Sequence, residues 1–288
     1  MKECILYRQE KNKVRCLVCS HKCLIAEGKT GICGVRKNEK GKLYLLVYGK
    51  VAAMHVDPIE KKPLYNFLPG TNAFSIGTVG CNFRCAWCQN ADISQISKTG
   101  KIFGENITPS EIVENAIKTK CESIAYTYNE PAIFVEFAKD TAKIAKRKKL
   151  KNILVTNGYF SKESFDFISD FIDAVNIDLK SFSEKTYEKY CGAKLKPVLD
   201  NIKWFHEKGI HVEVTTLVIP GINDSDKELE KIAKFISSID KNIVWHISRF
   251  FPMYKMTDRE ITPVEILKKA EQIGKKYLNY VYMGNVRL

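Results

Sequence analysis

Short apolar runs alternate with amphipathic stretches along most of the chain. The apolar runs are short enough for buried strands and lie at 122–128, 152–158, 174–182, 211–221 and 243–250. Between them, apolar residues recur at helical spacing over 131–148, 161–171, 197–209, 226–239 and 262–277. Continuous apolar strands between amphipathic helices predict a parallel sheet whose outer face is covered by helices.

Two of the predicted helices begin with a capping-box pattern. Thr108 stands three residues before Glu111, and Thr262 three residues before Glu265. In a capping box, the Thr hydroxyl and the Glu carboxylate each accept a hydrogen bond from a free backbone N–H of the first turn. We therefore expect the two helices to start at these threonines.

The strand count favours an open or partial (β/α)6 barrel over a doubly wound sheet. Starting from 73–80, six strands alternate with helices and a last strand follows at 280–284. Residues 1–72 differ, with more cysteines, two short β-like runs at 43–49 and 50–56, and a link rich in Pro and Gly at 57–72. We predict a small Cys-rich, metal-binding N-terminal module over 1–72 and the barrel over 73–288.

Length and composition favour a globular protein of the reducing cytoplasm. The chain has 288 residues, 45% of them apolar, and ten cysteines. No secretory signal and no apolar run of bilayer-spanning length is visible, so we expect a cytoplasmic location and no membrane partner. Clustered cysteines in that compartment indicate metal binding more often than disulfides.

The charge has two readings. The net charge is +13, and much of the excess is lysine interspersed with glutamate. This pattern is typical of solvated helix faces. A diffuse positive field could also serve an anionic or nucleic-acid partner. The absence of an arginine-rich or aromatic-interleaved segment favours the first reading.

A loop of three cysteines carries the main chemical signal. Cys81, Cys85 and Cys88 have the spacing C-x3-C-x2-C directly after the first barrel strand, and loops at this end of barrel strands carry catalytic residues. A structural zinc site needs four closed ligands, whereas an iron–sulfur cube has four irons. Three thiols therefore leave one iron open for a small molecule.

A second group of cysteines lies near the N-terminus. Cys16, Cys19, Cys23 and Cys33 place four thiols within 18 residues, which indicates a metal site. A closed zinc site and a second iron–sulfur cluster both fit this number of ligands. Three further cysteines are not spaced as ligands: Cys4, Cys121 and Cys191. We expect Cys121 to be a core residue; Cys191, at the end of a predicted helix, could lie near the site, although a core position is favoured.

The three-cysteine loop, with Trp87 before its last cysteine, resembles the loop of radical S-adenosylmethionine (SAM) enzymes. The resemblance implies a [4Fe–4S] cluster on Cys81, Cys85 and Cys88, with SAM bound to the open iron. It also implies reductive cleavage of SAM to a 5′-deoxyadenosyl radical that abstracts hydrogen from a substrate. The electron donor would be a protein such as ferredoxin or flavodoxin.

Shorter segments resemble the strand ends of glycyl-radical activating enzymes: "YTYNEP" (126–131), "VTNGY" (155–159) and "IDLK" (177–180). The resemblance implies that Asn129 and Glu130 lie at the SAM amino group, Glu130 binding it. It places Asn157 and Asp178 near the ribose, Lys180 in the same cofactor site, and Trp87 against the adenine.

Three further segments resemble the radical SAM member of the AmmeMemoRadiSam system, a relative of pyruvate formate-lyase activating enzymes: "LDNIKWFHEKGIHVEVTTLVIPGINDS", "WHISRFFPMYKM" and "YVYMGNV". This likeness covers nearly the whole chain. It implies that His246 and Arg249 line the SAM or substrate side of the barrel.

The substrate stays open at this stage. One hypothesis is an activase that forms a glycyl radical on a partner protein; another is an enzyme that modifies a small molecule, a nucleotide or tRNA. A hypothesis from another class is a zinc-binding module without catalysis.

Overall fold

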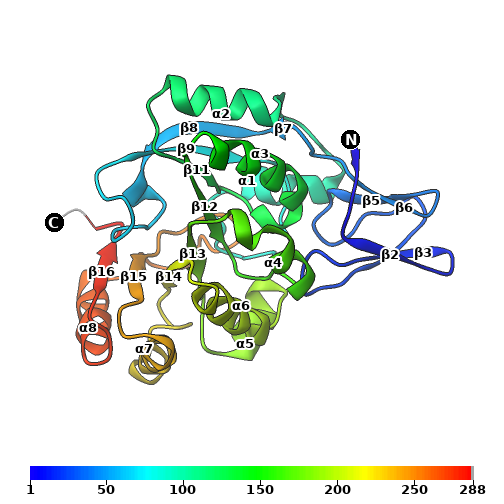
Figure 1. Cartoon of the computed structure of the whole chain (residues 1–288). Coiled ribbons are helices and arrows are strands. Elements are labelled where there is room, and N and C mark those ends of the chain that lie inside the picture. The colour runs from blue at the N-terminus through cyan, green and yellow to red at the C-terminus, as the bar shows by residue number, and fades with distance from the viewer. Residues whose placement is uncertain (287–288) are drawn as a thin grey trace.

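The computed structural model describes residues 1–286. Across these residues, the main sheet has eight strands, which curve into a partial barrel (Figure 1). In their order across the sheet they are β16 (Val281–Gly284), β15 (Val244–Arg249), β14 (His211–Val218), β13 (Ala174–Asp178), β12 (Lys151–Thr156), β11 (Ser123–Tyr126), β9 (Asn72–Gly77) and β8 (Ala53–Pro58). All neighbours pair in parallel except β8 and β9. The predicted strands and the partial barrel are confirmed.

Amphipathic helices cover the outer face of the sheet (Figure 1). The longer ones are α2 (Pro109–Lys118), α3 (Val135–Arg147), α4 (Lys162–Ile168), α6 (Leu195–Glu207), α7 (Asp226–Ile239) and α8 (Val264–Lys275). Two single turns are α1 (Ala91–Ser94) and α5 (Glu184–Thr186). Short 3-10 turns cover Ile59–Lys61, Ile96–Thr99, Pro131–Phe134 and Ser169–Phe171, and a π turn covers Tyr187–Cys191. None of these helices, within 1–286, is long and apolar enough to cross a membrane.

The two capping boxes have different outcomes. The hydroxyl of Thr108 and the carboxylate of Glu111 form the reciprocal bonds that start α2, as predicted. The second prediction is wrong, because α8 starts after Pro263 and has no side-chain cap. The hydroxyl of Thr262 instead donates to the carbonyl of Val218 (2.7 Å) and accepts from the backbone N–H of Phe250 (3.2 Å), so it ties the ends of β14 and β15 together.

The N-terminal residues form small antiparallel sheets beside the barrel, at the right of Figure 1. One contains β1 (Lys2–Glu3), β6 (Lys42–Leu45) and β5 (Arg36–Glu39), and another contains β2 (Tyr7–Glu10), β3 (Lys13–Cys16) and β4 (Leu24–Ala26). The short strands β7 (Lys50–Val51) and β10 (Glu105–Asn106) form a two-stranded ribbon. One correction concerns β8. The sequence placed this run in the N-terminal module, but it is the antiparallel edge strand of the main sheet.

The segment 59–68, predicted to be a link, fills the inside of the barrel. Ile59 and Leu64 are fully buried and pack in one cluster with residues on the inner face of the sheet: Ala73, Ala125, Ile153 and Ala174. Because three of these four strand positions are alanine, the inner space is free for larger side chains from the link. We call 59–68 the plug.

A buried carboxylate anchors the plug. Glu213 of β14 is fully buried and accepts hydrogen bonds from the backbone N–H groups of Tyr65 (3.0 Å) and Asn66 (2.9 Å). The side chain of Asn176 donates to the carbonyl of Pro63 (2.7 Å). These bonds satisfy plug backbone groups that are otherwise removed from water.

A buried ion pair joins the N-terminal sheets to the barrel. Arg36 and Glu136 are both 2% exposed, and two guanidinium nitrogens donate to the two carboxylate oxygens, one of them at 2.9 Å. Arg36 also donates to the carbonyl of Ile133 (3.0 Å). Because neither charge reaches water, each depends on the other for its stability.

We expect Glu136→Gln to lower the free energy of unfolding by about 3–5 kcal/mol, because it leaves the Arg36 charge buried without a counter-ion. The control is Asp166→Asn in the exposed Lys162–Asp166 pair, which should change it by less than about 1 kcal/mol. Chemical denaturation measures both. Equal effects of the two substitutions would contradict the role given to the buried pair.

Candidate functional site

A pocket of about 330 Å³ opens at the carboxyl ends of the parallel strands. Loops after successive strands supply its walls, and the plug adds Lys62 and Pro63. The sequence-predicted residues that line it are Cys81, Cys85, Trp87, Cys88, Asn129, Asn157, Asp178 and Lys180. The structure therefore brings together eight of the residues singled out from motifs on four different strands.

The cysteine loop is fixed by its neighbours on both sides. The backbone N–H groups of Arg84 and Ala86 donate to the carbonyls of Cys191 (2.9 Å) and Tyr190 (3.1 Å) in the π turn. At the start of the loop, Gly80 has φ +100°, and a Cβ atom there would lie 2.8 Å from the carbonyl oxygen of Cys33. Only glycine allows this close approach to the N-terminal residues.

The thiols of the loop are enclosed to different degrees. Cys81 and Cys85 are buried and Cys88 is half-buried. Cys191 is fully buried, as expected for a core residue. Its thiol is also the main cause that lowers the pKa of Cys85, so the core cysteine influences the loop.

Asn129 secures the entry to the cysteine loop. Its amide donates to the hydroxyl of Thr78 (3.0 Å) and to the carbonyl of Gly80 (2.9 Å), and its oxygen accepts from the backbone N–H of Thr78 (3.2 Å). Since both ends of the amide are occupied, Asn129 lies in the pocket wall mainly as a support for the loop.

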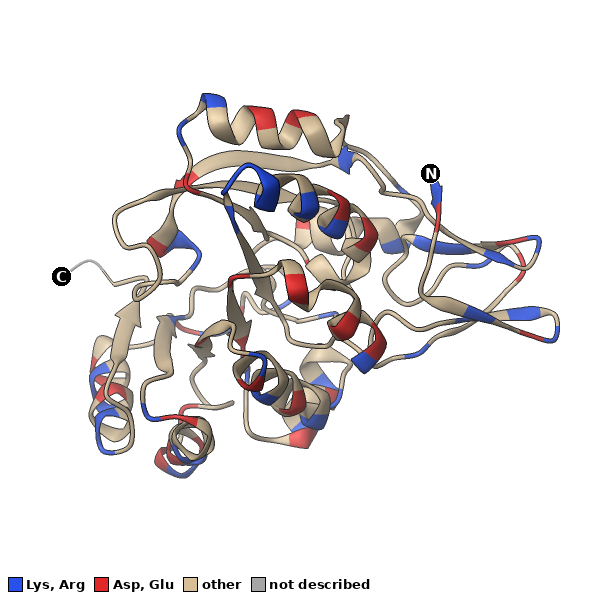
Figure 2. Ribbon diagram, in the orientation of Figure 1, with Lys and Arg blue, Asp and Glu red and all other residues tan. Residues whose placement is uncertain are grey.

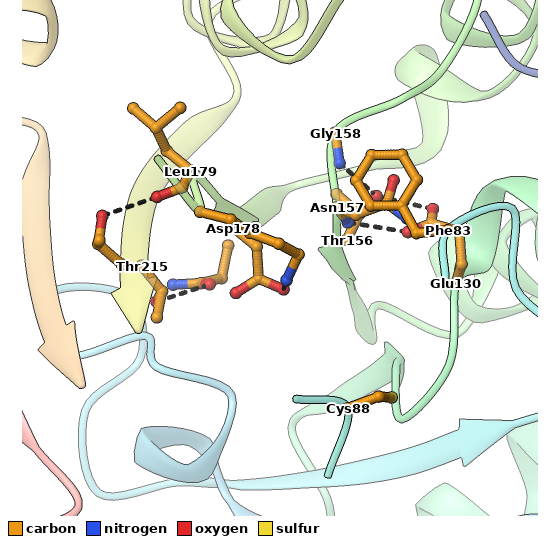
Figure 3. Close-up of polar contacts among 12 residues, drawn as sticks. Phe83, Cys88, Glu130, Thr156, Asn157, Gly158, Asp178, Leu179 and Thr215 are labelled. Atoms are coloured by element: carbon orange, nitrogen blue, oxygen red, sulfur yellow. Dashed lines mark hydrogen bonds and ion pairs between the residues drawn. The ribbon is translucent and has the colours of Figure 1, made fainter. Parts of the chain in front are cut away.

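Glu130, which the resemblance placed at the SAM amino group, does not line the pocket, and its contact with SAM stays a prediction. It is fully buried, and its carboxylate accepts from the backbone N–H of Ala132 (2.9 Å), the hydroxyl of Thr156 (2.7 Å) and the backbone N–H of Asn157 (2.8 Å). Burial raises the pKa of this carboxyl to about 7, against the effect of the three donors. Figure 3 shows Glu130 directed at Thr156 and Asn157.

Asn157 turns its side chain toward the cysteine loop. Its Nδ2 donates to Oδ1 of Asn82 (2.7 Å), whereas its own Oδ1 is buried and has no partner within 1–286. A buried amide oxygen without a donor is costly, and a bound molecule with N–H or O–H groups would satisfy it. The pocket thus offers an acceptor beside the three thiols.

Asp178 and Lys180 form an ion pair in the opposite wall. The two charged groups are 3.0 Å apart, and the side chain of Lys180 is 14% exposed. Burial opposes the charge of Lys180, but Asp178 and the thiols of Cys85 and Cys191 raise its pKa well above the usual value. Asp178 ends β13 beside Thr215 of β14 (Figure 3).

Trp87 forms an apolar part of the wall. It is 3% exposed, and its ring lies 5.8 Å from that of Tyr190, at an angle of 43°. Its indole therefore offers a rigid surface to a planar group in the pocket.

The sequence did not reveal what the plug adds to the pocket. The ammonium group of Lys62 lies 2.7 Å from the Asp57 carboxylate and 4.6 Å from the centre of the Tyr128 ring. Burial alone would raise the pKa of Asp57, but Lys62 and the Tyr128 hydroxyl hold it well below its usual range. No local pattern marks this group, because it depends on how the plug enters the barrel.

His246 and Arg249 lie outside the pocket. His246 is buried, and its Nε2 lies 2.5 Å from the Glu213 carboxylate beside the Tyr65 ring, so it supports the plug and does not line the pocket. Arg249 donates from Nε to the carbonyl of Thr262 (2.8 Å). It lines an adjoining recess of about 620 Å³ with Gln89, Phe251, Asn285 and Val286.

The four N-terminal cysteines are also brought together. Cys16, Cys19, Cys23 and Cys33 line one small cavity, separate from the pocket. Asn82 of the loop is part of the cavity wall. The two groups of cysteines are therefore neighbours in space.

This chain belongs to the radical SAM superfamily: residues 75–236 match the profile of that family. It is 44% identical to an uncharacterized protein of Methanocaldococcus jannaschii, over 99% of this chain and 86% of the relative. It is 24% identical to the pyruvate formate-lyase-activating enzyme of Clostridium pasteurianum, over 69% of this chain and 88% of that enzyme. In fold it is similar to a radical SAM methyltransferase from Sphaerobacter thermophilus, with a TM-score of 0.57, 16% identity, and coverage of 75% and 67% of the two chains.

The family establishes the chemistry. Radical SAM enzymes use a [4Fe–4S] cluster and SAM, so this chain is an enzyme and not a zinc-binding module without catalysis. The homology to activating enzymes agrees with the resemblance drawn from the strand ends.

We expect Glu130→Gln to lower the free energy of unfolding by about 1–3 kcal/mol, because an amide nitrogen would face a backbone donor that now has an acceptor. SAM affinity should fall only indirectly, through a displacement of Asn157 in the pocket wall. Denaturation and SAM titration of the same sample test this. A large loss of SAM affinity at unchanged stability would restore Glu130 as a direct ligand.

Proposed function

We propose that this chain is a radical SAM activating enzyme that acts on a segment of a partner protein. One observation carries the proposal: the pocket with the three thiols adjoins a second, open recess, which is partly lined by apolar side chains. The similarity to a pyruvate formate-lyase-activating enzyme supports it, since that relative is named for its action on another enzyme.

The pocket residues fit the family's cofactors. Cys81, Cys85 and Cys88 would hold the cluster, and the unpaired Oδ1 of Asn157 would accept a hydrogen bond from SAM. Asp178 and Lys180 would provide polar contacts, and Trp87 an apolar face. When bound, the two cofactors supply a 5′-deoxyadenosyl radical, which takes a hydrogen atom from the substrate.

The chain's own residues have supporting tasks. Asn129 and Asn157 hold the start of the cysteine loop at Gly80 and Asn82, which fixes the position of Cys81 at the pocket. The plug closes the barrel from within and excludes water from that side. Enclosure of this kind protects a reactive intermediate from side reactions.

The mouth of the pocket favours a polypeptide. The segment after β15 exposes Phe251, Met253, Tyr254 and Ile261, whose exposed fractions are 36–42%. Phe251 lines the recess next to Arg249. Exposed apolar side chains on a segment that reaches a functional pocket are typical of protein–protein contact.

Further features of the proposal rest on the resemblance and the homology. We place the chain in the AmmeMemoRadiSam system, in the cytoplasm, with ferredoxin or flavodoxin as electron donor. Figure 2 shows basic and acidic residues interspersed on the outer helices, so the positive charge is spread and not concentrated for tRNA.

The test compares SAM cleavage with and without the partner protein, measured anaerobically as 5′-deoxyadenosine with a strong reductant. We expect Phe251→Ala/Met253→Ala to lower the partner-dependent part by about tenfold or more, because two apolar contacts are worth at least about 1.4 kcal/mol in binding. Cleavage of SAM alone should be unchanged.

Two further variants serve as controls for this measurement. Tyr280→Ala removes a side chain of 40% exposure before β16, at the opposite end of the strands, and should keep the partner response. Cys81→Ala should show no cleavage at all. Stimulation by RNA or by a small molecule in place of a protein would contradict the proposal.

A further inference from the structure

The four N-terminal thiols form one site and not a loose collection. Cys16, Cys19 and Cys33 are buried and Cys23 is half-buried, although only Cys16 belongs to β3 and the other three lie in connecting segments. All four line the same small cavity. Apolar side chains complete the cavity wall: Val18, Ile25, Ile32 and Ile133.

Asn82 provides an independent sign of a missing ligand. Its Nδ2 is buried and has no hydrogen-bond acceptor within residues 1–286, although Asn82 lines the thiol cavity. Its Oδ1 faces the other way and accepts from Asn157 (2.7 Å). A buried N–H group without a partner is destabilising, so an acceptor inside the cavity would stabilise this arrangement.

The spacing of the thiols separates zinc from a cluster. Around one zinc ion, bond lengths near 2.3 Å in a tetrahedron put neighbouring sulfurs about 3.8 Å apart. Within 1–286, no three His, Cys, Asp or Glu side chains are arranged to hold a single ion. The same holds for Cys81, Cys85 and Cys88, the loop of a [4Fe–4S] family. Four thiols that line one cavity without being arranged around a single ion suit a cluster, in which each thiolate binds a different iron.

We propose that Cys16, Cys19, Cys23 and Cys33 bind a second [4Fe–4S] cluster, to which the side chain of Asn82 donates a hydrogen bond. Asn82 then links two sites, because its oxygen is bonded to Asn157 at the SAM pocket and its nitrogen faces the second cluster. The proposal does not depend on the substrate of the enzyme.

Hydrogen bonds hold the walls of the cavity against the cysteine loop and the turn that follows it. His21 bonds through Nε2 to the carbonyl of Asn82 (2.9 Å), and the hydroxyl of Ser97 donates to the carbonyl of Cys33 (2.9 Å). A cluster held here would be oriented by the same loop that carries Cys81.

The first experiment counts metals in full-length protein purified without oxygen. In the triple variant Cys81→Ala/Cys85→Ala/Cys88→Ala, the N-terminal set is the only predicted cluster site, and we expect about four irons with matching sulfide. The parent should hold about twice as much. Cys121→Ala, outside both sets, should match the parent. One zinc without iron in the triple variant, or neither metal in a folded protein, would overturn the proposal.

A second measurement tests Asn82 in the triple-variant background. Asn82→Asp keeps the shape but removes the N–H donor, so the midpoint potential of the remaining cluster should become more negative. The control is Asn90→Asp, which adds the same charge on the same loop at a residue that lines the SAM pocket. If the midpoint potential shifts no more in Asn82→Asp than in Asn90→Asp, the proposed hydrogen bond from Asn82 to the cluster is wrong. Either failure would leave SAM cleavage by the parent untouched, so it can be told from failure of the proposed function.

Discussion

The buried carboxylate of Glu130 is the constraint on which the site depends. It joins the turn after β11 to the end of β12, because its oxygens accept from Ala132, Thr156 and Asn157. Asn157, fixed in this way, holds Asn82 of the cysteine loop. A single residue without contact to the pocket therefore sets the relative position of two strand ends and of the thiols. A buried carboxyl group of this kind is stable only because its oxygens accept hydrogen bonds from the surrounding donors.

The barrel and the N-terminal residues depend on each other through the same loop. On one side, the ion pair of Arg36 and Glu136 fastens the N-terminal sheets to α3. On the other, Gly80 lets the cysteine loop lie against Cys33 without a side chain between them. The plug acts from the interior, where Glu213 and His246 hold it beneath the pocket. The pocket is thus enclosed by segments that are far apart along the chain.

Periodicity predicted the alternation of strands and helices, because one buried face leaves a clear pattern in each element. Motif spacing predicted Cys81, Cys85 and Cys88, and strand ends predicted Asn157, Asp178 and Lys180 as pocket residues. The features that the sequence did not reveal have a common physical origin. The plug, the burial of Glu130 and the partner of His246 depend on tertiary contacts that local sequence does not encode. Thr262 fits a capping box, but contacts with β14 and β15 take its hydroxyl instead.

The central claim is that the pocket beside the three thiols binds SAM at an iron of the cluster they hold. The most direct measurement is the electron paramagnetic resonance spectrum of the reduced, anaerobic protein, recorded before and after addition of SAM. A ligand that binds to the open iron changes the electronic structure of the cluster, so the account predicts a shift in the g values of a [4Fe–4S]⁺ signal. That shift should be lost in Cys88→Ala. A spectrum that is the same with and without SAM, in protein with its full iron and sulfide content, would contradict the account.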